Sequence, residues 1–205
     1  MNKIELRTYF QGILNNTEST DTLADSFLDV ALRRMQRRLR LEGMETTYTY
    51  TVPETGYVGI PIPTDYLDKK YLWLVDGDDS RQLEMLPMSK WIVQPDDGGT
   101  PCFYIRQGTY FQVKPTPLAG KTFKLLYYKQ QAPLMSDGDY NALTTEAPEV
   151  VAYGALVLAA DYFADVRGGG FKAAYTEMMM DLQAKADLEE VSGSDQSQAP
   201  AYADY

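Results

Sequence analysis

The residues best suited to bind a metal form two short acidic clusters. Asp76, Asp78 and Asp79 make up the first, and Asp96 and Asp97 the second. Carboxylates at such spacing can bind Ca²⁺, but an EF-hand loop needs a glutamate at its twelfth position, which neither cluster has. Because Asp and Gly are typical of solvated turns, we predict two turns and no metal site.

The chain lacks the residue types on which most catalytic sites depend. It contains no histidine, so no Ser-His or Cys-His pair can form, and the commonest metal ligand is missing. Cys102 is the only cysteine, which excludes a disulfide within the chain. The glycines at 168–170 are not followed by the Lys-Ser/Thr of a phosphate-binding loop, so we predict a hinge between helices there. We expect no catalytic residue and no cofactor, and therefore not an enzyme.

A cluster of arginines is the strongest local departure from an acidic composition. The net charge of -10 makes general nucleic-acid binding unfavourable, because the phosphate backbone dominates that affinity. The arginine cluster lies in the second half of a helix predicted over residues 20–42 and consists of Arg33, Arg34, Arg37, Arg38 and Arg40. At about 100° per residue, Arg33, Arg37 and Arg40 point away from the apolar face of that helix. The cluster is either a solvated helix face or a docking surface for acidic protein or nucleic acid.

Sixteen tyrosines are many for 205 residues. Some alternate along predicted strands: Tyr48 and Tyr50 share one strand face. Alternating tyrosines can simply build the sheet, whereas Tyr48 and Tyr50 could form a platform on which sugars stack or a contact with another subunit. We favour the sheet and the subunit contact over the sugar platform. A carbohydrate-binding module would instead show sugar-dependent fluorescence from Trp73 or Trp91.

The predicted helix over residues 20–42 has a clear apolar face. Thr20 or Asp21 can cap its start and Gly43 can end it. A shorter helical pattern precedes it within residues 1–18 and ends in a turn at 15–17. The residues of the apolar face recur at spacings of three and four: Ala24, Phe27, Leu28, Ala31, Leu32, Met35 and Leu39.

The middle of the chain changes to short alternating segments rich in β-formers. Their spacing predicts a small antiparallel sheet or barrel, with one helical turn at 89–93. The predicted strands cover residues 46–52, 57–62, 70–75, 82–86, 103–106, 109–114 and 121–128.

Two helices and a tail follow. Residues 149–164 are apolar nearly all round, which predicts burial on several sides, with Thr144 or Thr145 as the cap and Pro148 in the first turn. Residues 171–188 form an amphipathic helix. The tail at 191–205 has a disordered composition, with Tyr202 and Tyr205 as its sizeable apolar residues. We expect another chain to hold it as an extended arm through these two anchors.

The elements together predict an α+β fold, in which N- and C-terminal helices form one bundle and the β domain is an insertion. The predicted domains are residues 1–43 and 131–190 for the two helical parts, 44–130 for the β domain, and 191–205 for the tail arm. The opening residues lack the apolar stretch of a signal peptide. The longest apolar run, 150–160, is shorter than the ~20 residues that span a bilayer.

Several phrases of the sequence resemble the head-to-tail adaptor proteins of short-tailed phages, of the tail tubular protein A type. The similarity extends from about residue 23 to residue 188 and includes no catalytic residue. It rests on the order of the elements and on ALRRMQRRLRLEG (31–43), IPIPTDYLDKKYLWL (60–74), GTPCFYIRQGTYFQVKPTPLAGKTFKLLYYKQ (99–130) and EVVAYGALVLAADYF (149–163).

The resemblance implies a structural virion protein at the portal–tail junction. Such adaptors form a ring, usually of twelve copies, that binds the portal protein above and the tail nozzle protein below. In some phages they also help to seat a tail fibre, and genomic DNA passes through their channel without sequence-specific binding. An acidic channel wall would let DNA slide past, because attraction to phosphate is what retains it.

Overall fold

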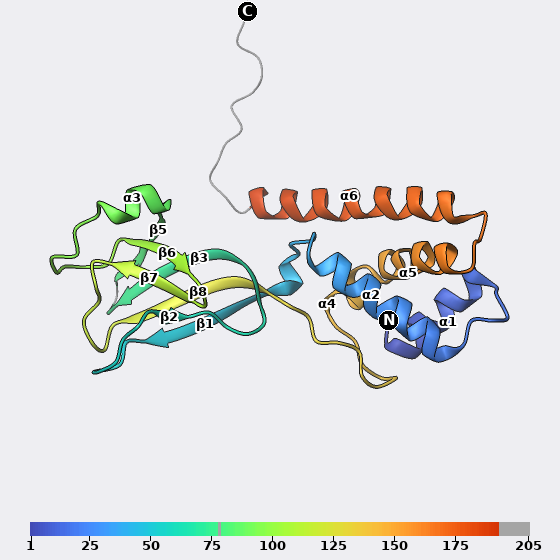
Figure 1. Cartoon of the computed structure of the whole chain (residues 1–205), viewed down its shortest axis with the longest axis horizontal. Coiled ribbons are helices and arrows are strands. Elements are labelled where there is room, and N and C mark those ends of the chain that lie inside the picture. The colour runs from blue at the N-terminus through green and yellow to red at the C-terminus, as the bar shows by residue number, and fades with distance from the viewer. Residues whose placement is uncertain (78, 193–205) are drawn as a thin grey trace, which may run out of the picture. The chain divides into compact units, whose positions relative to one another are not determined.

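The computed structural model describes residues 1–77 and 79–192, and its helices and antiparallel sheets confirm the α+β class (Figure 1). The chain folds as two compact units. The helical unit takes Met1–Gly43 together with the chain from Gln131 onward, and the β unit takes Met44–Gln130.

The helical unit begins with α1 (Lys3–Leu14) and α2 (Asp21–Gln36). Asn2 and Glu5 form a reciprocal capping box at the start of α1, and Asn15 ends it in the left-handed conformation at φ 47°. Thr20 caps α2 by accepting a hydrogen bond from the Leu23 N–H at 3.3 Å. The short helix, the turn and the Thr20 cap are all confirmed.

The predicted end of the long helix at Gly43 is wrong, because α2 ends at Gln36. The N–H groups of Arg38 and Leu39 both donate to the Met35 carbonyl, which closes the last turn. Beyond it, Leu39 and Leu41 are both buried. Residues two apart share a side in an extended chain and not in a helix, so burying both favours leaving the helix. A 3-10 turn over Glu42–Met44 follows.

The second half of the helical unit contains α4 (Ala142–Glu146), α5 (Pro148–Tyr162) and α6 (Gly168–Ser192). The predicted caps Thr144 and Thr145 are wrong for α5: Asn141 caps the separate helix α4, and α5 begins at Pro148. The prediction that the apolar helix is buried on several sides is confirmed, because α5 packs against α1, α2, α4 and α6. Its fully buried side chains are Val151, Ala152, Ala155, Leu156 and Ala159.

The predicted glycine hinge is also wrong. Residues 168–170 form the first turn of α6, and the chain reverses earlier, where Ala164 takes a φ of 53°. A Cβ on Gly168 would lie 3.2 Å from the Ala160 Cβ, so this position brings α6 close to α5. Because α6 reaches Ser192, the predicted tail boundary at 191 is too early. Tyr202 and Tyr205 lie outside the described residues.

The β unit contains two four-stranded sheets where the sequence predicted one sheet or barrel. The first sheet has the order β1-β8-β3-β4 and is antiparallel throughout. Its strands are β1 (Glu45–Thr51), β3 (Tyr66–Asp76), β4 (Asp79–Gln82) and β8 (Thr122–Lys129).

The second sheet has the order β2-β7-β6-β5, and its β5–β6 pair is parallel, which departs from the antiparallel prediction. The predicted strand at 57–62 shrinks to β2, because Gly59 takes a φ of 136° just before it and prolines lie at its end. Its strands are β2 (Ile60–Pro61), β5 (Glu84–Met85), β6 (Phe103–Gln107) and β7 (Tyr110–Lys114), and the short helix α3 (Met88–Ile92) follows β5.

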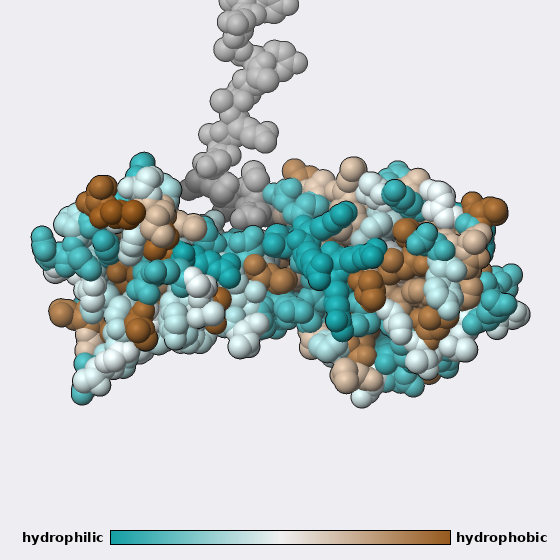
Figure 2. Space-filling model, in the orientation of Figure 1, coloured by the Kyte–Doolittle hydropathy of each residue, from teal (hydrophilic) through white to brown (hydrophobic). Residues whose placement is uncertain are grey.

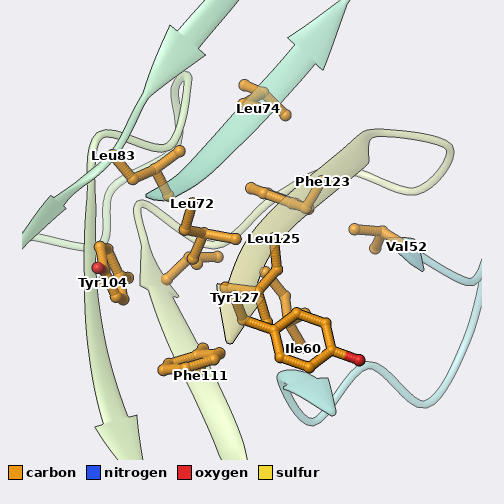
Figure 3. Close-up of a cluster of buried hydrophobic side chains, with 11 residues drawn as sticks. Val52, Ile60, Leu72, Leu74, Leu83, Tyr104, Phe111, Phe123, Leu125 and Tyr127 are labelled. Atoms are coloured by element: carbon orange, nitrogen blue, oxygen red, sulfur yellow. The ribbon is translucent and has the colours of Figure 1, made fainter. Parts of the chain in front are cut away.

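One apolar cluster joins the two sheets (Figure 3). Leu72, Leu125 and Tyr127 come from the first sheet, and Tyr104 and Phe111 from the second. Because the cluster draws on both sheets, it holds the β unit together around a core of its own.

Candidate interaction surfaces

The acidic clusters serve as turn and ion-pair residues where the structure describes them. The Asp96 carboxylate accepts hydrogen bonds from the Thr116 N–H at 2.6 Å and the Thr116 hydroxyl at 3.0 Å. Asp76 pairs with Lys121 at 2.6 Å. Across residues 1–77 and 79–192, no group of three or more metal-ligating side chains comes together.

The sequence suggested that the five arginines lie on one helix, but the structure divides them. Arg33 and Arg34 lie in the last turn of α2, whereas Arg37, Arg38 and Arg40 follow its end. Arg33 pairs with Asp29 at 2.7 Å. The Arg40 guanidinium donates to the carbonyls of Leu39 at 2.8 Å and Gln36 at 3.3 Å. Arg40 therefore closes the end of α2 and is only partly available to a partner.

The other three arginines, Arg34, Arg37 and Arg38, are exposed, and we call them the arginine patch. Within the described residues they form no ion pair. The patch lies near Tyr175, which is on the packed side of α6. Burial raises the pKa of the Tyr175 hydroxyl, and the nearby charges of Arg38 and Arg34 offset part of that rise. The helical unit thus carries three positive charges that no described acid neutralises.

Helix α6 has two different sides. Its inner side is half-buried and packs on α5, where Tyr175 lies so close to Gly154 that an added Cβ would be 3.0 Å from its ring. Its outer side is exposed, with Met180 at 67% and Leu188 at 70% of their full accessible surface. We call the exposed residues Ala173, Glu177, Met180, Asp181, Ala184 and Leu188 the outer face of α6.

Tyr48 and Tyr50, which the sequence suggested for a sugar platform or a subunit contact, instead pack against the core of the β unit and are partly buried. Other aromatic residues lie on the opposite, outer side of the same sheet. Tyr71 and Trp73 alternate along β3 and line a hollow of about 360 Å³ together with Ser80, Gln82 and Leu126. Sequence reasoning missed this pair, although the alternation in KYLWLV was the available signal.

A second apolar area lies on and around α3. Met88, Ile92 and Val93 are all more than half exposed. Figure 2 shows a brown patch among polar residues at the place where Figure 1 shows α3. The segment is held firmly: the Lys114 ammonium donates to the carbonyls of Trp91 at 3.3 Å and Gln94 at 3.0 Å and lies 4.9 Å from the centre of the Trp91 ring. Fixed, exposed apolar side chains of this kind mark contact sites.

These surfaces favour assembly over catalysis, and a comparison with protein families agrees. The model of the SU10 adaptor protein family matches residues 1–201. The chain belongs to this family. The family match confirms the prediction of a phage head-to-tail adaptor. It does not test the finer resemblance to the tail tubular protein A type. No curated protein matches the chain.

Membership identifies the protein as a structural adaptor of the phage virion. The match covers the first eighteen residues and most of the tail, to which the sequence resemblance did not extend. In the part of the adaptor that the structure describes, no helix is both long and apolar enough to cross a membrane.

The adaptor's helical unit also contains a charge network that sequence reasoning missed. Arg7 of α1 binds both carboxylate oxygens of Asp25 on α2 at 2.7 Å, and reaches Asp137 at 3.0 Å. Lys3 pairs with Asp25 at 3.1 Å. Burial alone raises the pKa of Asp25, but the hydrogen bonds from Arg7 and Lys3 outweigh it and hold that pKa below its usual value. The network fastens α1 to α2 and to the chain that returns from the β unit.

Proposed function

We propose that the adaptor assembles as a ring under the portal, joins the portal to the tail nozzle and extends the DNA channel. The observation that carries this proposal is the outer face of α6, which leaves large apolar side chains exposed in a chain of the SU10 adaptor family. Monomeric proteins rarely expose contiguous apolar area without a partner. The copy number proposed is twelve, the number usual in the proteins that the sequence resembles.

We assign different partners to the two units. The helical unit forms the ring and contacts an adjacent subunit or the portal through the arginine cluster, and the tail at 193–205 adds an arm anchored by Tyr202 and Tyr205. The β unit, divided from it at Gly43 and Gln130, contacts the nozzle or a tail fibre. The exposed side chains of α3 and the hollow beside Trp73 support this second assignment.

The net charge of -10 supports a passive channel. A ring of acidic subunits repels phosphate, so DNA can pass without being retained. The arginine cluster holds five of the 19 lysine and arginine residues, and we assign it to protein contacts.

The test is reconstitution with the portal protein of the same phage. Purified adaptor mixed with portal should form rings on it, which negative-stain and cryo-electron microscopy would show, and tailed virions should hold the chain at the portal–tail junction. Adaptor incubated with portal from an unrelated phage is the control. Virions that carry this chain at any other position would contradict the proposal.

The hollow beside Trp73 also supports a second candidate, a carbohydrate-binding module. An aromatic pair with a neighbouring hydroxyl and amide is suited to stack on a sugar ring and to bind its hydroxyls. Titration with host-surface oligosaccharides should then quench Trp73 fluorescence in the Trp91→Phe variant, with the Trp73→Phe variant as the matched control. Equal signals from both variants would exclude this candidate.

A further inference from the structure

Helix α6 exposes two large apolar side chains, Met180 and Leu188, on the side that does not pack on α5. Its inner side packs on α5, and within the described residues nothing covers the outer face, where Met180 and Leu188 are more than two-thirds exposed. Ala184 lies one turn after Met180 and Ala173 two turns before it, and these small residues leave room for the close approach of another chain.

The charges beside the outer face are mixed: Lys172 lines one groove with Glu177, Met180 and Asp181, and Lys185 pairs with Glu189. Glu177 and Asp181 flank Met180, and in the described part of the chain neither forms an ion pair or a side-chain hydrogen bond. An apolar centre with charged residues at its edge is the usual anatomy of a protein interface. The partner of this face should therefore offer positive charge around an apolar contact.

The same unit carries a surface with those properties. The arginine patch of Arg34, Arg37 and Arg38 has positive charges that no described acid neutralises. Val30 lies one helical turn before Arg34 on α2 and is 40% exposed, so it supplies an apolar contact beside the patch. The two surfaces are complementary in charge and apolar content, yet the structure shows no ion pair between the patch and the described acids of α6.

We propose that the outer face of α6 in one copy binds the arginine patch and Val30 of the next copy. This inference rests on the proposed ring and names its subunit contact. Two different surfaces of one chain that bind each other make a heterologous contact, and repeated contacts of this kind close into a ring when the rotation permits. The portal is a weaker candidate occupant, because both halves of the complementary pair are already present in this chain.

Charge exchange tests the contact. One variant carries Arg34→Glu with Arg38→Glu, a second carries Glu177→Arg with Asp181→Arg, and a third combines all four. Ring formation on the portal is counted by electron microscopy and native mass spectrometry. Each reversed surface should reduce the fraction of complete rings several-fold, because like charges then face each other, and the combined variant should recover most of that loss.

The control carries Arg81→Glu with Lys90→Glu, which makes the same change in net charge as the first variant at exposed positions of the β unit and should leave ring formation unchanged. Circular dichroism and the unfolding midpoint check that every variant folds. Rings that form equally in all variants, or a combined variant no better than the worse of its parents, would overturn the inference. If the wild type forms no ring on the portal, the proposed function fails as well, which separates the two outcomes.

Discussion

Helices α5 and α6 pack against each other but differ in apolar content and in surroundings. α5 is packed by α1, α2, α4 and α6, and its centre is fully buried. α6 packs on α5 along one side and exposes Met180 and Leu188 on the other. The apolar sequence all round α5 is buried by the same chain. The exposed Met180 and Leu188 of α6 are, in our proposal, covered by a second copy.

Side-chain size distinguishes the two helices further. The sides of α5 that meet other helices are lined by alanine and by Gly154, which lets the Tyr175 ring and Ala31 approach closely. The outer face of α6 has long, unbranched Met180, a side chain that adapts to an irregular partner. One added methyl group in α5 should therefore lower the stability of the single chain. Substitutions on the outer face of α6 should affect the assembly and not the stability of the single chain.

The largest expected effect is on stability in α5. Leu156→Ala should lower the free energy of unfolding by about 2–5 kcal/mol, because it removes a fully buried side chain and leaves a cavity. Met180→Ala should change it by about 0.5 kcal/mol or less, since this side chain is mostly exposed. Urea unfolding of both variants measures the contrast, and equal losses would show that the outer face of α6 is already packed in the single chain.

The next effect concerns the ion pair that holds α1 and α2 over α5. The pKa of Asp25 is lower in the folded state, so its pairing stabilises the fold above the ordinary carboxyl pKa of about 4 and loses that contribution as the pH falls toward the folded value. Arg7→Met should cost about 1.5–3 kcal/mol at neutral pH, because a charge-assisted hydrogen bond is lost.

Unfolding measured from pH 7 to pH 2.5 separates this network from the rest of the fold. Asp25→Asn should flatten the pH dependence in the acid range, whereas Asp29→Asn, whose carboxylate lies in the exposed pair with Arg33, should leave it nearly as steep. A profile for Asp25→Asn that matches the wild type would show that the network does not tie the helices together.

A smaller effect is expected at the contact between α5 and α6, and a helical glycine outside this contact serves as the comparison. Gly12→Ala should stabilise the fold by about 0.5–1 kcal/mol, because Gly12 lies within α1 with open space around it. Gly154→Ala should instead lose about 1 kcal/mol, since its Cβ would meet the Tyr175 ring at 3.0 Å and the Ala31 Cβ at 3.3 Å. A gain at both positions would mean that α6 can move away from α5 at little cost.

The smallest effect on the single chain, and a clear one on the assembly, should come from salt. Exposed ion pairs contribute about 0–1 kcal/mol each and weaken as the Debye length falls from about 10 Å at 0.1 M to about 3 Å at 1 M. Raising the salt should therefore dissociate rings held by the arginine patch while the unfolding midpoint of the monomer stays nearly constant. Rings that survive 1 M salt unchanged would indicate an apolar contact without the charges.

The sequence predicted the elements well where local chemistry decides them. Thr20 and Asn15 mark helix ends by their own side chains and backbone preference, and the alternation in TTYTYT marks β1. The sequence failed where a tertiary contact decides. The end of α2 depends on burying Leu39 and Leu41 and on Gln36, whose side chain accepts a hydrogen bond from the Gln131 N–H at 3.0 Å. No periodicity shows a contact between residues so far apart in the chain.

The candidate surfaces were only partly predicted, because they too depend on tertiary contacts. The arginines were visible as a charge cluster, but their division between Arg40, which closes α2, and the exposed arginine patch requires the helix end. The sequence analysis missed the outer face of α6 because Phe171, Tyr175 and Met178 already explained the helix as amphipathic with one apolar side. Met180 and Leu188, which do not belong to that side, were the available signal.

Methionine oxidation tests the central claim most directly. The chain is treated briefly with peroxide, once free and once assembled on the portal, and the rate at each methionine is read by mass spectrometry. Met180 should react rapidly in the free chain and several-fold more slowly in the ring, while half-buried Met178 on the same helix changes little. Equal oxidation of Met180 in both states would show that the outer face of α6 stays exposed and would contradict the account.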